Sequence, residues 1–262
     1  MNAKTVSGLV LVAGCLLFAS ARAGPGGWDP GDPDRAVIPP RAETLGGSSE
    51  EWSAAWWQWA LTIPDGPAHP LYDQTGEHCG IGQHGGVWFL AGTFADEDPD
   101  TPTLEVTRAC TLPTGKAIFF PIVNIACSTL EAPPFGPPPG EEWGDAELSA
   151  CAAHFIDGPV ALVRGLRVSL DDRSLKQLDA HRARSPLFRF TLPSPNILGV
   201  AVPEAQETVE GQAVSDGYYV MLPPLSAGEH RLEVRGKFVD PDTHELVFGL
   251  DVAYDLRVVP PE

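Results

Sequence analysis

The sequence predicts a mainly β fold: a single antiparallel β-sandwich-like domain with a tryptophan-rich helix and a second short helix. Glycine and proline each occur 27 times in 262 residues, a frequency that favours short strands joined by turns. Apolar and charged residues alternate in the C-terminal third, as in strands that bury one face. Four tryptophans lie close together with helical spacing.

The overall composition excludes some classes of protein. Hydrophobic residues make up 43% of the chain and charged residues 20%, which is typical of a globular protein with a real core and excludes wholesale disorder. The formal net charge is −18, so the chain as a whole repels phosphate backbones and anionic lipids. We therefore do not expect nucleic acid as a partner.

The N-terminal residues have the features of a secretory leader. Lys4, an apolar run from Val6 to Ala19 and a small-residue ending predict a signal peptide over residues 1–23. The run is too short for a stable anchor, and the mature chain has no uncharged stretch of about 20 residues, so we expect no transmembrane segment. The alternative is a lipoprotein cleavage site that leaves Cys15 lipidated.

Two further segments follow the leader. Residues 24–47 are rich in proline, glycine and aspartate, and we expect an extended lead-in there. Residues 48–262 contain no internal repeat and no second linker, so we expect one domain. The protein is then secreted or periplasmic.

The four cysteines beyond the leader predict two disulfide bonds. Cys79, Cys110, Cys127 and Cys151 are an even number, as expected in an oxidising compartment. Of the three possible pairings we favour Cys79–Cys110 with Cys127–Cys151, because these close the nearest loops. No Cys-x-x-Cys pair occurs, so a zinc site is the weaker alternative.

The tryptophan segment predicts a helix. Ser48 and Glu51 stand three apart as a capping box, and Pro64 ends the helix. Trp57 lies off the apolar stripe. The stripe consists of Trp52, Trp56, Trp59, Ala60 and Ile63.

Short apolar runs bounded by turn residues predict strands, and Asp145 is expected to cap the second helix through about Phe155. The predicted strands are Val87–Phe94, Ala117–Val123, Val160–Leu170, Leu187–Leu192 and Tyr218–Leu222.

The clearest prediction is a hairpin at the C-terminus. Its first strand places Leu232, Val234 and Phe238 on one face, and a turn at Asp240–Asp242 follows. The second strand is expected to point Leu246, Phe248, Leu250, Val252, Tyr254, Leu256 and Val258 inward.

A resemblance to known proteins rests on four parts of the sequence: Trp56–Leu61, Gly86–Phe94, Gly115–Asn124 and Asp216–Val220 with Gly228–His230. They resemble segments of a family of secreted bacterial proteins to which no activity is assigned. The resemblance covers most of the mature chain and implies export and a β-rich domain, and it assigns no site.

One cluster of polar residues is a candidate metal site. His78 and His84 stand six apart in a glycine-rich segment, and imidazole is a common metal ligand. Asp73 and Glu77 can complete the site if the fold brings them near. The competing interpretation is two surface histidines in a loop held by a disulfide at Cys79.

A second candidate site is an acidic turn. Asp96, Asp98 and Asp100 offer the oxygen ligands that calcium prefers. The turn lacks the twelve-residue calcium-loop pattern, so an ordinary solvated turn is the competing interpretation.

A third candidate is a ligand contact at Trp57, Gln83 and Trp88. Aromatic rings beside polar groups can stack on a sugar or line a ligand cleft. Tryptophans at helical spacing are more often core residues, and we expect that for Trp52, Trp56 and Trp59.

These patterns lead to two functional hypotheses. No established catalytic motif occurs in the sequence. We therefore expect a secreted or periplasmic non-catalytic protein that binds a small molecule, a glycan or a protein surface. The alternative is a secreted hydrolase that uses a divalent metal held by His78 and His84.

Overall fold

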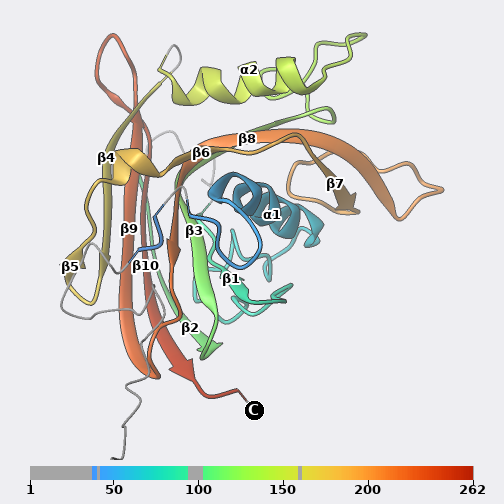
Figure 1. Ribbon diagram of the computed structural model, residues 1–262. Coiled ribbons are helices and arrows are strands. Elements are labelled where there is room, and N and C mark those ends of the chain that lie inside the picture. The colour runs from blue at the N-terminus through green and yellow to red at the C-terminus, as the bar shows by residue number, and fades with distance from the viewer. Residues whose placement is uncertain (1–36, 40–41, 94–102, 159–160, 262) are drawn as a thin grey trace, which may run out of the picture.

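The computed structural model describes residues 37–39, 42–93, 103–158 and 161–261. Within them, the strands form two sheets that face each other (Figure 1). The first sheet has the order β1–β3–β8–β6, and β7 also pairs with β8. Its strands are β1 (Val87–Phe89), β3 (Ala117–Ser128), β6 (Arg182–Arg184), β7 (Phe188–Pro193) and β8 (Thr208–Leu222).

The second sheet has the order β2–β10–β9–β4–β5. Its strands are β2 (Thr103–Pro113), β4 (Leu162–Leu170), β5 (Arg173–Ser174), β9 (Gly228–Val239) and β10 (Leu246–Val259). The predicted mainly β, sandwich-like fold is confirmed. The sheets are mixed rather than purely antiparallel, because β1 runs parallel to β3 and β2 runs parallel to β10.

The core between the sheets comes from alternating residues. In β3 and β8, side chains such as Ile118, Phe120 and Val220 face the second sheet, where they meet residues such as Leu232 and Leu256. These side chains are almost completely buried, so this contact is the main apolar interface of the sandwich.

The C-terminal hairpin is confirmed with one correction. β9 and β10 pair antiparallel along most of their length, with Val234 opposite Val252. Leu246, predicted to point inward, is 37% exposed. The register shifts between Leu246 and Phe248, and a bulge of this kind turns the strand end away from the core.

The predicted tryptophan helix is α1 (Ser49–Thr62), and it covers the outer face of the first sheet (Figure 1). Ser48 and Glu51 form the expected capping box, and Ile63 is the C-cap that follows the last helical residue. Trp56 is 1% exposed, and its indole N–H donates to the Leu90 carbonyl at 2.9 Å. The helix therefore packs on the sheet and is also hydrogen-bonded to the segment that follows β1.

The second helix is α2 (Asp145–Ile156), which begins after Gly144 rather than after the expected Asp145 cap. Leu148 and Ala152 pack on Val214 of β8. Alternate residues of β8 point to opposite faces of the sheet. The part of β8 beyond the second sheet therefore lies between α1 and α2, as Figure 1 shows.

Both predicted disulfides are present. Cys79 bonds to Cys110, and Cys127 bonds to Cys151. The first joins the segment between α1 and β1 to β2, and the second joins β3 to α2. No helix in the described part of the chain is long and apolar enough to cross a membrane. The two disulfides are compatible with an extracellular or periplasmic protein.

Several predictions fall on residues that the structure does not describe. The leader 1–23 with Cys15 lies outside the described residues, as does most of the lead-in 24–47. The acidic turn of Asp96, Asp98 and Asp100 lies outside them too. These remain predictions.

Candidate functional site

The predicted metal ligands lie in the segment that joins α1 to β1. Asp73 is buried, His78 is partly buried, and Glu77 and His84 are exposed. No group of three or more histidine, cysteine, aspartate or glutamate side chains among the described residues is placed to hold a metal ion. The hydrolase hypothesis therefore gains no support from the geometry and stays a prediction.

Asp73 organises this segment. One carboxylate oxygen accepts hydrogen bonds from the Thr75 and Gly76 amides and from the Thr75 hydroxyl. The other oxygen accepts from the His78 amide at 2.8 Å. Burial alone would raise the pKa of Asp73, but these hydrogen bonds outweigh it and lower the pKa. The carboxylate is thus already engaged by its own loop.

Gln83 and Trp88 also have structural contacts. The Gln83 amide donates to the carbonyls of Cys79 and Phe89, and its oxygen accepts from the Phe89 amide. Trp88 is buried in the core between the sheets. The two residues do not share a surface with Trp57, which packs in the cluster on the other face of the first sheet.

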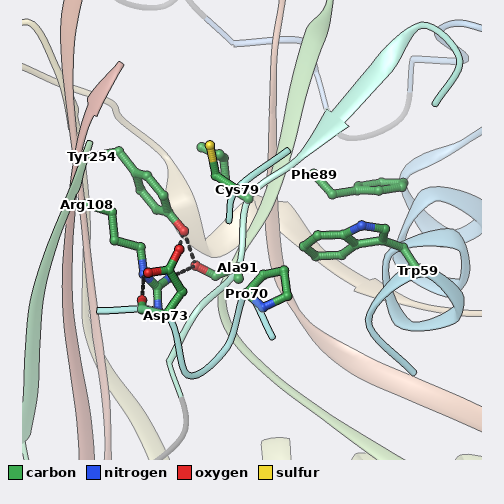
Figure 2. A pocket seen from close by; sticks show the side chains of 9 residues that line it. Trp59, Pro70, Asp73, Cys79, Phe89, Ala91, Arg108 and Tyr254 are labelled. Carbon is green, nitrogen blue, oxygen red and sulfur yellow. Dashed lines mark hydrogen bonds between the residues drawn. The ribbon is translucent and has the colours of Figure 1, made fainter. Parts of the chain in front are cut away.

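Arg108 of β2 lies beside Asp73 and Tyr254 and clamps the same segment through hydrogen bonds (Figure 2). Arg108 is 1% exposed, and its guanidinium donates to the carbonyls of Asp73, Ala91 and Gly92 and to the Tyr254 hydroxyl. The adjoining cavity is only about 10 Å³, too small for a ligand of several atoms. We therefore interpret this buried cluster as a structural support.

A cavity large enough for a small ligand lies beside Trp57. It measures about 150 Å³ and is partly open to solvent. Helix α1, strands β3 and β8 and two loops form its walls. Most of the lining is apolar: Trp57, Leu61, Ile125, Ala126, Phe135, Leu198 and Ala213.

Two polar side chains interrupt this apolar lining. Ser128 is the last residue of β3, and its hydroxyl donates a hydrogen bond to a Glu131 carboxylate oxygen at 2.8 Å. Burial raises the pKa of Glu131 from 4.5 to about 7, although the Ser128 hydrogen bond lowers it in part. Near neutral pH the carboxyl therefore exists in both protonation states, and it can donate or accept a hydrogen bond.

Trp57 separates this cavity from a polar cluster formed by Tyr219, Ser215 and Asn124. Trp57 is 7% exposed, and its indole N–H has no hydrogen-bond partner among the described atoms. Burial raises the pKa of the nearby Tyr219 hydroxyl to about 12. The side chains of Ser215, Asn124 and Trp57 lie close to this hydroxyl and lower the pKa in part. The sequence suggested a contact role for Trp57 because it lies off the helix stripe, and the structure places it at this cavity.

The loop that carries Glu131 is held in place from several sides. The Ser128 amide donates to the Phe135 carbonyl, and the Thr129 amide donates to the Gln212 carbonyl. A Cβ at Gly136 would lie 2.0 Å from the Glu131 carbonyl oxygen, so only glycine fits there. The Cys127–Cys151 disulfide fixes the start of the loop. The cavity rim is therefore preformed.

Comparison of the chain with protein-family models, with curated proteins and with solved structures finds no match. Functional arguments for this chain therefore rest on its own residues.

Glu131 is the residue that sequence reasoning missed. It lies at the start of a proline-rich segment whose composition predicts only a loop. Its burial depends on packing against β3, α1 and the loop at Leu198. The one local signal is Ser128 three residues earlier, a spacing that allows the observed side-chain bond.

Proposed function

We propose that the chain is a binding protein that holds a small molecule in the cavity beside Trp57. The ligand has a compact apolar body and one hydrogen-bonding head group, an amine or a hydroxyl. The observation that carries this proposal is the combination of an apolar cavity of about 150 Å³ with one carboxyl, Glu131, at its lining.

The volume sets the size of the apolar body. A cavity of about 150 Å³ lined by apolar side chains accommodates a single aromatic ring such as benzene. Trp57 and Phe135 supply flat aromatic surface, and Leu61 and Leu198 supply aliphatic contacts. These groups suit one ring or a short branched chain rather than a long lipid tail.

Glu131 determines the head group. A partly buried carboxyl with a pKa of about 7 is stabilised in its charged form by a cation, and in either form it can bond to a hydroxyl. Because Ser128 already bonds to one oxygen, the other oxygen is the one assigned to the ligand. A primary amine gains an ion pair there that a hydrocarbon lacks.

The proposed place of action is outside the cytoplasm. The two disulfides support this, and the leader predicted over residues 1–23 supplies the route of export. The mature protein is acidic, so an amine ligand is also attracted by its overall charge.

Calorimetric titration with toluene, benzyl alcohol and benzylamine tests the proposal. We expect benzylamine and benzyl alcohol to bind more tightly than toluene at pH 8. Ala126→Leu fills the cavity and abolishes binding of all three, whereas Ala150→Leu, at an exposed position of α2, leaves binding unchanged.

The carboxyl has its own control. Glu131→Gln lowers benzylamine affinity about tenfold, because a charge-assisted bond is lost, and leaves toluene affinity unchanged. Glu142→Gln removes an exposed carboxyl and is expected to have no effect. Equal binding by the wild type and Ala126→Leu would show that the cavity is not the site.

A further inference from the structure

A second surface of this acidic protein has the opposite charge. Four exposed cationic side chains lie on the outer face of β4 and β9, and a fifth belongs to Lys176, two residues beyond β5. We call this surface the cationic face. Its cations are Arg164, Arg167, Lys176, Arg235 and Lys237. The chain as a whole has a net charge of −18, so this face is a local exception.

The register of the strands places like charges side by side. Arg164 pairs with Lys237, and Arg167 pairs with Arg235. Like charges directly opposite each other across two strands are destabilising. The arrangement therefore opposes folding stability, and a bound anion would relieve it.

Most of these cations lack a counter-ion in the protein. Arg235 pairs with Asp251 at 2.9 Å. The other four have no carboxylate within 4 Å among the described residues. Elsewhere on the same sheet, Arg231 pairs with Asp255, and Arg257 pairs with Glu229 at 3.7 Å. The cationic face thus brings close together four cations that have no carboxylate partner in the described part of the chain.

The cationic face is hollowed rather than flat. Two depressions of about 410 and 420 Å³ adjoin there and share Lys176. A register shift between Arg164 and Arg167, with Gly165 at φ +65, interrupts the regular pairing of β4 with β9. Polar groups also line the depressions: Ser169, Ser174, Gln177, Tyr218, and the acidic Asp179 and Glu233.

We propose that the cationic face binds a short carboxylated oligosaccharide. Arginine and lysine bind the carboxylates, and the serine, glutamine and tyrosine side chains bond to sugar hydroxyls. Two adjoining depressions provide room for more than one sugar ring. One charge per ring also gives a lower charge density than nucleic acid, which carries one charge per about 1.7 Å and is repelled by the rest of this surface.

Two other partners fit the geometry less well. A peptide that adds a strand needs a regular sheet edge. β5 covers only Ser169 and Leu170 of β4, and the rest of that edge is irregular, because the register shifts between Arg164 and Arg167 and Gly165 has a positive φ. A membrane surface would meet the exposed Leu246 and Val247 of the β9–β10 hairpin. That hairpin also carries acidic residues, among them Asp240, which anionic lipids repel.

Titration with tetragalacturonic acid at about 0.1 M salt, where distant charges are screened, tests the proposal. The fully methyl-esterified oligosaccharide is the neutral control and is expected to bind about tenfold more weakly. Arg167→Gln with Lys176→Gln is expected to lower affinity for the acid by about the same factor. Arg189→Gln with Arg257→Gln, which removes two exposed arginines elsewhere, changes affinity less than about twofold.

A stability measurement separates lost recognition from lost folding. Because the Arg167→Gln change removes a like-charge pair, the first double variant should unfold at an equal or higher temperature than the wild type. Ala126→Leu, which fills the cavity beside Trp57, should leave oligosaccharide binding unchanged, so the two proposals fail independently.

Three results would overturn the inference. Equal binding of the acid and its methyl ester would show that charge is not recognised. Equal loss in the two double variants would show an effect of net charge alone. Tighter binding of oligoglutamate or of anionic vesicles than of the oligosaccharide would assign the face to a different partner.

Discussion

Glu131→Gln is expected to change the pH dependence of stability in a defined direction. Burial raises the folded-state pKa of this carboxyl from 4.5 to about 7, so the folded protein holds the proton more tightly than the unfolded chain. Between these two pH values the unfolded state releases its proton first, and stability falls as pH rises. Below about pH 4.5 the carboxyl is neutral in both the folded and the unfolded state, so it does not lower the free energy of unfolding.

The magnitude follows from the same two values. A difference between 4.5 and about 7 corresponds to about 3 kcal/mol of destabilisation once the folded carboxyl is ionised. Most of this develops between pH 5 and pH 8, where we expect about 2 to 3 kcal/mol. Glutamine cannot ionise, so the variant should be close to the wild type in stability at pH 5 and more stable than the wild type at pH 8.

Urea unfolding with intact disulfides at the two pH values measures this effect. Subtracting the wild-type free energy of unfolding from that of the variant cancels the histidines, including His69 and His181, whose pKa values burial lowers. Glu142→Gln, at an exposed position, is the matched control and should show no such difference. If Glu131→Gln followed the wild type in parallel across this range, the carboxyl would not be buried as described.

Three further predictions concern the supports of the site. Arg108→Met leaves the carbonyls of Asp73 and Gly92 without their donor and should lower the free energy of urea unfolding by about 3 kcal/mol. A loss below about 0.5 kcal/mol would contradict the clamp. Because hydrogen bonds lower the folded pKa of Asp73, its contribution is present above pH 3.8 and is lost as pH falls through the folded value. Asp73→Asn should therefore cost more stability at pH 7 than at pH 2, and an equal cost at both would refute this. Cys127→Ser with Cys151→Ser opens a loop of sequence separation 24 and should cost about 3 kcal/mol. It should also weaken benzylamine binding, as calorimetry would show, and unchanged affinity would mean that the loop needs no anchor.

Elements specified by neighbouring residues could be predicted from the sequence. The capping box of Ser48 and Glu51 marks the start of α1, and alternation of apolar with polar residues marks most of β9 and β10. Both disulfides follow from the shortest loops. In each case the deciding signal lies within a few turns or a few tens of residues, so no knowledge of the tertiary fold is needed.

Features that depend on distant segments could not be predicted. β2 was missed because Arg108 occupies an inward position and interrupts its apolar pattern, and because its partner is β10, far along the chain. That arginine is tolerated because backbone carbonyls and Tyr254 surround it. The cationic face likewise arises only when β4 and β9 pair, since Arg167 and Arg235 are far apart in sequence.

The candidate site was predicted only in part. Trp57 was singled out because it lies off the helix stripe, and it does line the cavity. Identifying core residues from one apolar stripe assumes that a helix packs on one surface only. Helix α1 is also covered by the loops that carry Glu131 and Leu198. The polar residues near His78 looked functional because they are clustered, yet most of their hydrogen bonds hold their own loop together.

Anomalous diffraction from crystals soaked with 4-bromophenol tests the central claim most directly. The account predicts one bromine peak in the cavity bounded by Trp57 and Leu198, with the phenol oxygen within hydrogen-bonding distance of Glu131. The absence of a peak there at saturating ligand, or a peak only elsewhere on the molecule, would contradict it.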